Sequence, residues 1–341
     1  MKRIAICMLL GAFLVAAMPT ATSQEESAPI VSLMIDVYTP SSPNYDQVRS
    51  AEVNLHEMYS EIKKRGGTAT IFLTEDVTSS RIRLILAQYT VLSNFEFAVS
   101  GKHSDDQLST MSLSDQEALI ARSIRVANAA RVCGLSSVEV LGFMPPGFDQ
   151  NQDTYVAIDN LGIQYDAGFQ AGIIYEPGHE TDVWPYRVEG HNFSAVPIST
   201  ASVGGELVPL YDRAMNDSGI SSSEWQNILA AKLDESAANS EPMVVLISTS
   251  ISGKGEYLTA LKGFLNYAVS KDTIFVNARD LVEISTTGNL TLPEGRLYEC
   301  PACGQDEGKG ITITPEEPEP MTSINGTIDE DLTEATEETA A

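Results

Sequence analysis

Residues 65–73 read RGGTATIFL and join the end of an amphipathic stretch to a short apolar run. The amphipathic stretch covers residues 45–64 and stops at Gly66-Gly67, as a helix does. The run that follows is β-branched and aromatic, so it predicts a buried strand. Another strand candidate, residues 30–37, precedes the amphipathic stretch. Strand, helix and strand in this order predict the start of a parallel sheet covered by helices.

The same alternation continues along the chain. Further strand candidates are residues 95–99, 138–143, 165–169, 193–198, 243–247 and 273–276, and further helix candidates are residues 79–88, 113–132, 153–161, 222–238 and 257–269. Ser114 is the expected N-cap of the helix over 113–132, and Glu117 would complete a capping box. This number of strands fits a closed barrel and an open doubly wound sheet equally well.

The first 23 residues have the composition of a secretory signal. Lys2 and Arg3 give a basic start, residues 4–17 are apolar, and residues 21–23 offer small side chains for cleavage. An uncleaved N-terminal anchor is the alternative. No later stretch reaches the roughly 18 apolar residues of a membrane span. We therefore expect a secreted or extracytoplasmic protein, whether free or attached to the cell surface.

The charge excludes one class of partner. The chain has 21 basic and 47 acidic residues, a formal net charge of −26. Nucleic-acid binding needs a basic footprint, and none is visible. Residues 314–341 are acidic with no basic residue, and this composition predicts a disordered tail. The expected division is a signal peptide (1–23), a barrel domain (24–286) and a linker with an acidic low-complexity tail (287–341).

The four cysteines do not form a disulfide framework. Cys7 belongs to the signal, and Cys133 stands alone, as a small buried apolar residue does. Cys300 and Cys303 form one CxxC pair within the linker. A structural zinc site usually needs two such pairs. A local disulfide and a zinc ion shared between two chains are the alternatives.

Polar residues leave several of the predicted strands. Active residues of parallel α/β barrels lie at the carboxyl ends of strands. Asp36 closes the run SLMID, residues 101–106 read GKHSDD, and residues 143–148 read FMPPGF. Ser248 and Thr249 follow the strand candidate over 243–247. These places are where chemistry is expected.

Four segments of the chain resemble one known family, the NodB-homology polysaccharide deacetylases of the fourth carbohydrate esterase family. Residues 65–72 are similar to its Gly-x-x-Ala-Thr-Phe-Phe strand, and His103-Ser104 to its His-Ser/Thr-x-x-His segment. Residues 142–147 and 161–166 resemble its Phe-Arg-Pro-Pro-x-Gly and Leu-Gly-Phe-x-Tyr-Asp segments. The resemblance covers residues 28–284 and implies a distorted (β/α) barrel with its groove at the carboxyl ends of the strands.

The resemblance implies a metal-dependent hydrolysis of a non-peptide C–N bond. The family holds a divalent metal, usually zinc, with one Asp and two His, and uses a second Asp as base, an Arg that orients this base and a late His as acid. By this resemblance Asp36 is the catalytic base and His103 a metal ligand. The other four positions carry Val37, Gln107, Met144 and Ser248.

Other side chains could complete a metal site. Asp106 is the expected carboxylate ligand, with Asp105 as its alternative. His179 or His191 could approach from the segment after the fifth strand. The competing hypothesis is that His103 is a structural loop histidine, so zinc binding is doubtful.

The resemblance also implies a substrate-binding groove. It assigns Pro145 and Pro146 to the groove, and Trp184 is a candidate platform for sugar stacking. A packing role is equally compatible with Trp184. For Asp36, the alternative to a catalytic role is a structural one, in which its carboxylate caps nearby backbone amides.

Two functions follow from these observations. The first is an exported protein that deacetylates or binds N-acetylated glycans of the cell envelope or surroundings. The second is a catalytically inactive glycan-binding or cell-surface scaffold protein that retains the barrel. A serine hydrolase is disfavoured, because no Gly-x-Ser-x-Gly elbow stands between a predicted strand and helix.

Overall fold

The computed structural model describes residues 28–78, 95–129 and 140–288. The predicted signal peptide, the helix over 79–88, the acidic tail and all four cysteines lie outside these residues. None of the helices within the described ranges is long and apolar enough to cross a membrane.

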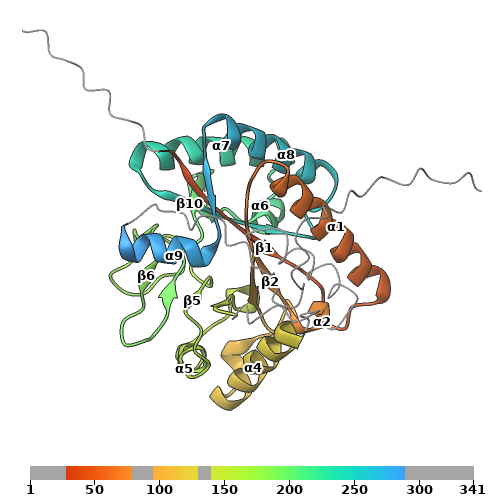
Figure 1. The fold of residues 1–341 in the computed structure, drawn as a ribbon, viewed down its shortest axis with the longest axis vertical. Coiled ribbons are helices and arrows are strands. Elements are labelled where there is room, and N and C mark those ends of the chain that lie inside the picture. Colours follow the sequence, from red (N-terminus) through yellow and green to blue (C-terminus); the bar gives the residue numbers. More distant parts are fainter. Residues whose placement is uncertain (1–27, 79–94, 130–139, 289–341) are drawn as a thin grey trace, which may run out of the picture. The chain divides into compact units, whose positions relative to one another are not determined.

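The described strands form one large mixed sheet and one hairpin (Figure 1). The order in the large sheet is β10 (Pro242–Ser248), β1 (Ile30–Asp36), β2 (Thr70–Leu73), β3 (Glu96–Val99), β4 (Gly142–Phe143), β5 (Tyr165–Asp166), β7 (Ser194–Ala195) and β6 (Tyr186–Arg187). All neighbours are parallel except β6 and β7. The sheet is a curled half-barrel, which confirms the distorted (β/α) barrel.

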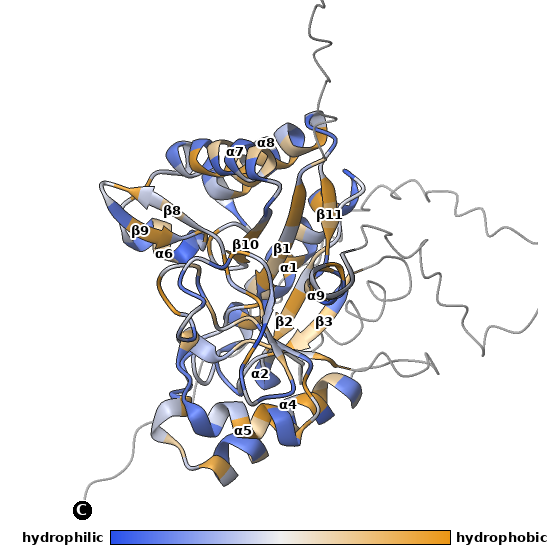
Figure 2. Cartoon of the chain, turned by 90° about the vertical axis from the view of Figure 1, so that its left-hand side faces the viewer, coloured by the Kyte–Doolittle hydropathy of each residue, from blue (hydrophilic) through white to orange (hydrophobic). Residues whose placement is uncertain are grey.

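Strand β1 has three partners. Strand β10 pairs with its whole length. On the other side, β11 (Ile274–Val276) pairs with residues 30–32, and β2 pairs with residues 34–36. Every residue of β1 and β10 is buried, as expected for parallel strands with both faces covered. Figure 2 shows β1, β2 and β11 as predominantly hydrophobic.

The two faces of the sheet contribute to different hydrophobic clusters. Leu33 and Ile35 pack in the cluster that contains buried residues of α1 (Tyr45–Lys63), α7 (Ser222–Asn239) and α8 (Gly255–Ser270). Met34, between them in sequence, packs in a second cluster with Leu281 of α9 (Ala278–Thr287). This division follows from the two-residue period of a strand. A third cluster lies under α4 (Leu113–Ala129) and α5 (Gln152–Asn160).

Helix α4 begins differently from the sequence prediction. The Ser112 hydroxyl accepts a hydrogen bond from the Asp115 amide at 3.3 Å and donates one to the Asp115 carboxylate at 2.7 Å. The cap is therefore Ser112, and the capping box of Ser114 and Glu117 was wrong. Both serines are followed three residues later by an acidic side chain, so the local pattern could not separate them.

The sequence reading also missed a hairpin. Strands β8 (Thr200–Val203) and β9 (Glu206–Pro209) pair in antiparallel fashion around Gly204-Gly205. Both glycines have positive φ, 62° and 93°, as a tight two-residue hairpin turn requires. Helix α6 (Asp212–Asp217) follows directly. The remaining helical segments are α2 (Glu75–Thr78), η1 (Leu108–Thr110) and η2 (Pro146–Phe148).

Candidate functional site

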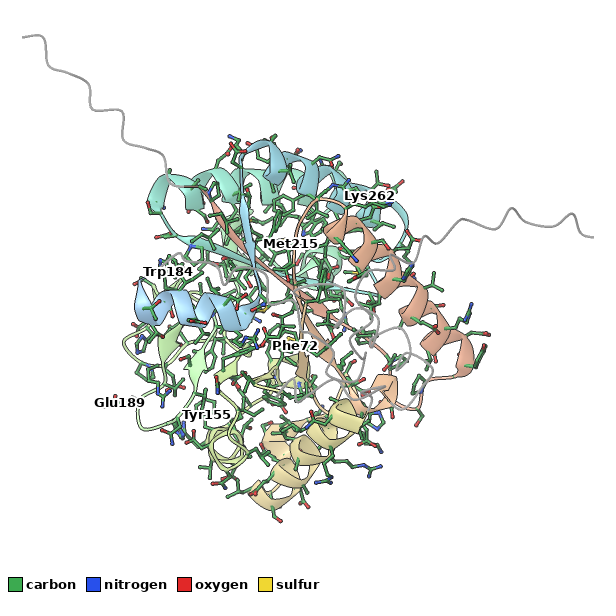
Figure 3. All side chains as sticks on the ribbon, viewed as in Figure 1. Phe72, Tyr155, Trp184, Glu189, Met215 and Lys262 are labelled. Atoms are coloured by element: carbon green, nitrogen blue, oxygen red, sulfur yellow. The ribbon has the colours of Figure 1, made fainter. Side chains whose placement is uncertain are left out.

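The carboxyl ends of β1 and β10 form the centre of the candidate site. Asp36 and Ser248 are register partners, and the Thr249 amide donates to the Asp36 carbonyl at 3.0 Å. Asp36 also pairs with Phe72 of β2, which Figure 3 marks in the middle of the fold. The apolar strands thus deliver Asp36 to the strand end that the sequence predicted.

The Asp36 carboxylate is nearly enclosed, with 7% of the residue exposed. The Tyr211 hydroxyl donates to its Oδ2 at 2.8 Å. Burial raises the pKa of Asp36, while this hydrogen bond and the positive charge of Arg213 act in the opposite direction. The expected alternative, a carboxylate that caps backbone amides, is not the contact that we observe.

Arg213 links this centre to the loop after β1. Its guanidinium lies over the Tyr38 ring at 3.8 Å from the centroid, within the range of a cation–π contact. Partial burial lowers the pKa of Arg213, but the nearby Tyr211 and Asp36 raise it above its ordinary value. Tyr38, Arg213, Tyr211 and Asp36 therefore form a connected polar group.

Asp212, beside this group, is fully buried. Its carboxylate accepts hydrogen bonds from the Ser248 amide at 2.8 and 2.9 Å and from the Ser252 amide at 3.0 Å. Burial raises its pKa to about 7, although these hydrogen bonds oppose the shift. Asp212 thus fixes the chain where it leaves β10.

The acidic side chains of the loop after β3 bond within the loop and to a neighbouring segment. The Asp106 Oδ2 accepts hydrogen bonds from the amides of Lys102 at 2.6 Å and His103 at 2.8 Å. The His103 Nδ1 lies 2.5 Å from the Asp76 Oδ2. Asp105 bonds to the Ser41 hydroxyl. These contacts fix the loop.

The residues present do not fit a zinc centre. Catalytic zinc needs three protein ligands and an open position. No group of three His, Cys, Asp or Glu side chains in the described part of the chain is placed to hold a metal ion. The other two candidate histidines are also paired, His179 with Asp182 at 2.7 Å and His191 with Asp159 at 2.8 Å.

The residues at the four other positions that the resemblance assigns to the family's site have different surroundings. Val37 is fully buried in the cluster that contains Leu33, and Met144 is 5% exposed in the cluster that contains Phe72. Gln107 is exposed. The Ser248 hydroxyl lies 2.8 Å from that of Ser250.

Pro145 and Pro146 fix the loop after β4 between two neighbouring loops. A Cβ added to Gly101 would lie 2.6 Å from the Pro146 Cγ, and one added to Gly168 would lie 2.5 Å from the Pro145 Cγ. Both glycines are therefore required by close packing. The Phe148 ring then contacts Tyr211 edge-on, with 5.9 Å between ring centroids.

Trp184 lies elsewhere. It lines a pocket of about 510 Å³ with Ile30, the first residue of β1, and with Ile284 of α9. Figure 3 also places Trp184 beside α9. Because a parallel strand rises about 3.3 Å per residue, the two ends of β1 are roughly 20 Å apart. Trp184 and Asp36 are thus not brought together.

Sequence reasoning missed Tyr211, Asp212 and Arg213. The three residues follow the missed hairpin, and the Tyr211 backbone forms a parallel bridge with Leu246 of β10. The only sequence signal was an aromatic, an acidic and a basic residue in succession between predicted elements. Assigning these three residues to the site would have required knowledge of the hairpin that precedes them.

Comparisons with known proteins bear on the fold. No family model matches the sequence, and no curated protein matches it. A protein assigned as a polysaccharide deacetylase from Mycobacterium smegmatis has a similar structure, with a TM-score of 0.61 and 14% identity over 80% of this chain and 96% of that chain. The chain has the polysaccharide-deacetylase fold.

Two further structures show the same fold. A protein assigned as a polysaccharide deacetylase from Pseudomonas aeruginosa PAO1 gives a TM-score of 0.58 and 13% identity, covering 75% of this chain and 90% of that chain. Puue allantoinase gives a TM-score of 0.61 and 14% identity, covering 77% and 92%. The polysaccharide-deacetylase fold is therefore present over most of the chain.

Proposed function

We propose that this protein binds N-acetylated glycans outside the cytoplasm and does not hydrolyse them. The observation that carries the proposal is which residues occupy the positions that the resemblance assigns to catalysis, and where these residues lie. Asp36 remains at the strand end, while Val37 and Met144 are core residues and Gln107 lies exposed. The Asp106 carboxylate accepts the His103 amide within its own loop, and the His103 side chain is paired with Asp76 of α2. The deacetylase fold supports glycans as the ligand class.

Export is part of the proposal. It is supported by the basic and apolar composition of residues 1–23 and by the small residues at 21–23. Residues 24–286 would then be the glycan-binding barrel, and residues 287–341 a linker and acidic spacer. The net charge of −26 favours neutral over polyanionic glycans.

One observation favours a second candidate, hydrolysis of an N-acetyl amide. Arg213 comes close to Asp36 from α6, as an orienting arginine would, although position 144 is Met. In this reading Asp36 accepts a proton from the attacking water. Its burial and its hydrogen bond from Tyr211 must then be relieved when substrate binds.

Acetate release separates the two candidates. The secreted chain, residues 24–341, would be incubated with N-acetylglucosamine oligomers and with peptidoglycan, with and without added zinc, and passed over a chitin column. We expect retention on the column, no acetate release and no stoichiometric metal. Acetate release that Asp36→Asn abolishes would establish the hydrolase instead. Absence of both retention and release would refute glycan binding.

A further inference from the structure

A second pocket, of about 520 Å³, lies beside the strand-end centre. Its volume is within the range of roughly 300–1,000 Å³ that small-molecule sites occupy. The segment after β1, helix α1 and the segment after β10 form its walls. The lining residues are Tyr38, Pro40, Asn44, Asp46, Gln47, Ser50, Ala51, Asn54, Thr249, Ser250 and Lys254. Neither Asp36 nor His103 contributes to this lining.

The lining carries several polar groups, and its charges balance. Amide and hydroxyl side chains predominate, and they both donate and accept hydrogen bonds, as sugar hydroxyl and acetamido groups do. One acidic side chain, Asp46, and one basic side chain, Lys254, balance in charge. Tyr38 adds an aromatic ring with an apolar face and a polar edge. This combination suits an uncharged, polyhydroxylated ring better than an ion.

The walls are held in place before any ligand binds. The Asn54 Nδ2 donates to the Thr249 carbonyl at 2.8 Å and ties α1 to the segment after β10. A Cβ added to Gly253 would lie 2.4 Å from the Asn54 Cβ, so this approach requires glycine. The Tyr38 amide donates to the Thr249 Oγ1 at 3.1 Å, and Arg213 covers the Tyr38 ring. Preorganised walls lower the entropy cost of binding.

The first turn of α1 leaves donors for a ligand. Asn44 and Gln47 form a reciprocal capping box, in which each side-chain oxygen accepts the other residue's backbone amide at 2.9 Å. Each of these oxygens already accepts one hydrogen bond, and within the described part of the chain the two NH₂ groups remain as donors. Both residues line the pocket. Carbonyl and hydroxyl oxygens of a sugar are suitable acceptors.

We propose that this pocket binds one neutral sugar ring of an N-acetylated glycan. The inference rests on the proposed function and adds the binding position: the side of the barrel between α1 and the segment after β10. The sugar would contact Tyr38 and accept hydrogen bonds from Asn44 and Gln47. Through Arg213, the occupied pocket is connected to Tyr211 and Asp36.

The test compares two substitutions on α1. Ser50 is exposed and lines the pocket, so Ser50→Trp fills it without disturbing the core. Val53, 47% exposed on the same helix, is not among the lining residues, so Val53→Trp is the matched control. Ser250→Trp fills the pocket from the opposite wall. Calorimetric titration with N-acetylglucosamine tetramer measures affinity, and thermal unfolding confirms that each variant is folded.

We expect both pocket-filling variants to lose at least tenfold in affinity, with Val53→Trp within twofold of wild type. Wild-type binding that both pocket-filling variants retain would overturn the pocket and leave glycan binding intact. Equal loss in Val53→Trp would also overturn it, because the effect would not be specific to the pocket. Failure of wild type to bind the tetramer or a chitin column would refute the proposed function and, with it, this site.

Discussion

Two buried carboxyl groups at the ends of strands differ in how they are satisfied. Asp212, beside β10, accepts hydrogen bonds from the amides of Ser248 and Ser252. Asp166, at the end of β5, accepts one hydrogen bond, from the Gly168 amide at 2.8 Å. Its Oδ2 has no hydrogen-bond partner within the described part of the chain.

The pKa values follow this difference. Burial raises the pKa of Asp212 to about 7 and that of Asp166 to about 8. More amide donors stabilise the charged form of Asp212, so its pKa rises less. The β10 side of the site is therefore built around a well-satisfied carboxyl group. The β5 side holds a carboxyl group that favours its neutral form.

The largest effect on stability should come from Asp212, the carboxyl group that accepts more hydrogen bonds. Asp212→Ala leaves two buried amides without an acceptor and should lower the free energy of unfolding by about 3 kcal/mol. Urea denaturation measures the change. Asp217→Ala, at an exposed position of the same helix, is the control and should change stability by less than about 0.5 kcal/mol. Equal losses would show that the amide contacts do not matter.

The next effect is a pH dependence on the β5 side. Between pH 4 and 8, folded Asp166 retains a proton that the unfolded chain releases, so stability falls as pH rises, by up to about 1.4 kcal/mol per pH unit. Asp166→Asn keeps the Gly168 contact and removes this slope. In urea denaturation at pH 5, 6, 7 and 7.5, the free energy of unfolding of the variant should rise relative to that of wild type as the pH increases. Parallel pH profiles would contradict the assignment.

A smaller effect is expected at Asp36. Tyr211→Phe removes one hydrogen bond to a buried carboxyl group and should lower the free energy of unfolding by about 1 kcal/mol. Since this bond lowers the pKa of Asp36, the variant's pKa should rise further, and its stability should fall more as pH increases. Carboxyl NMR titration and urea denaturation measure both. Tyr45→Phe, at a residue 66% exposed, should change neither.

The smallest effect is expected in the loop after β3. The pair of His103 and Asp76 is partly exposed, so His103→Asn should change stability by less than about 1 kcal/mol. Zinc should leave the melting temperature of wild type and variant unchanged. A zinc-dependent rise in wild type that His103→Asn abolishes would show that this loop does bind metal.

Local sequence patterns predicted part of the site. Asp36 and the PPG segment (145–147) were expected at strand ends, and they lie there because buried parallel strands are continuous apolar runs that end in polar residues. Trp184 was expected near the groove but lies toward the opposite end of β1. Its position depends on the path of the segment between β5 and β6, which has no periodic pattern.

The sequence by itself determined the alternation of strands and helices, and the resemblance of its motifs implied the deacetylase-type barrel. The alternation is encoded by residues close together in the chain. Only the tertiary structure decided what surrounds Asp36. Tyr211 meets it across 175 positions of sequence, and Asp212 reaches Ser248 across 36. Such contacts depend on the hairpin that precedes Tyr211 and on the backbone bridge between Tyr211 and β10. The periodicity of hydrophobic residues along the chain does not predict them.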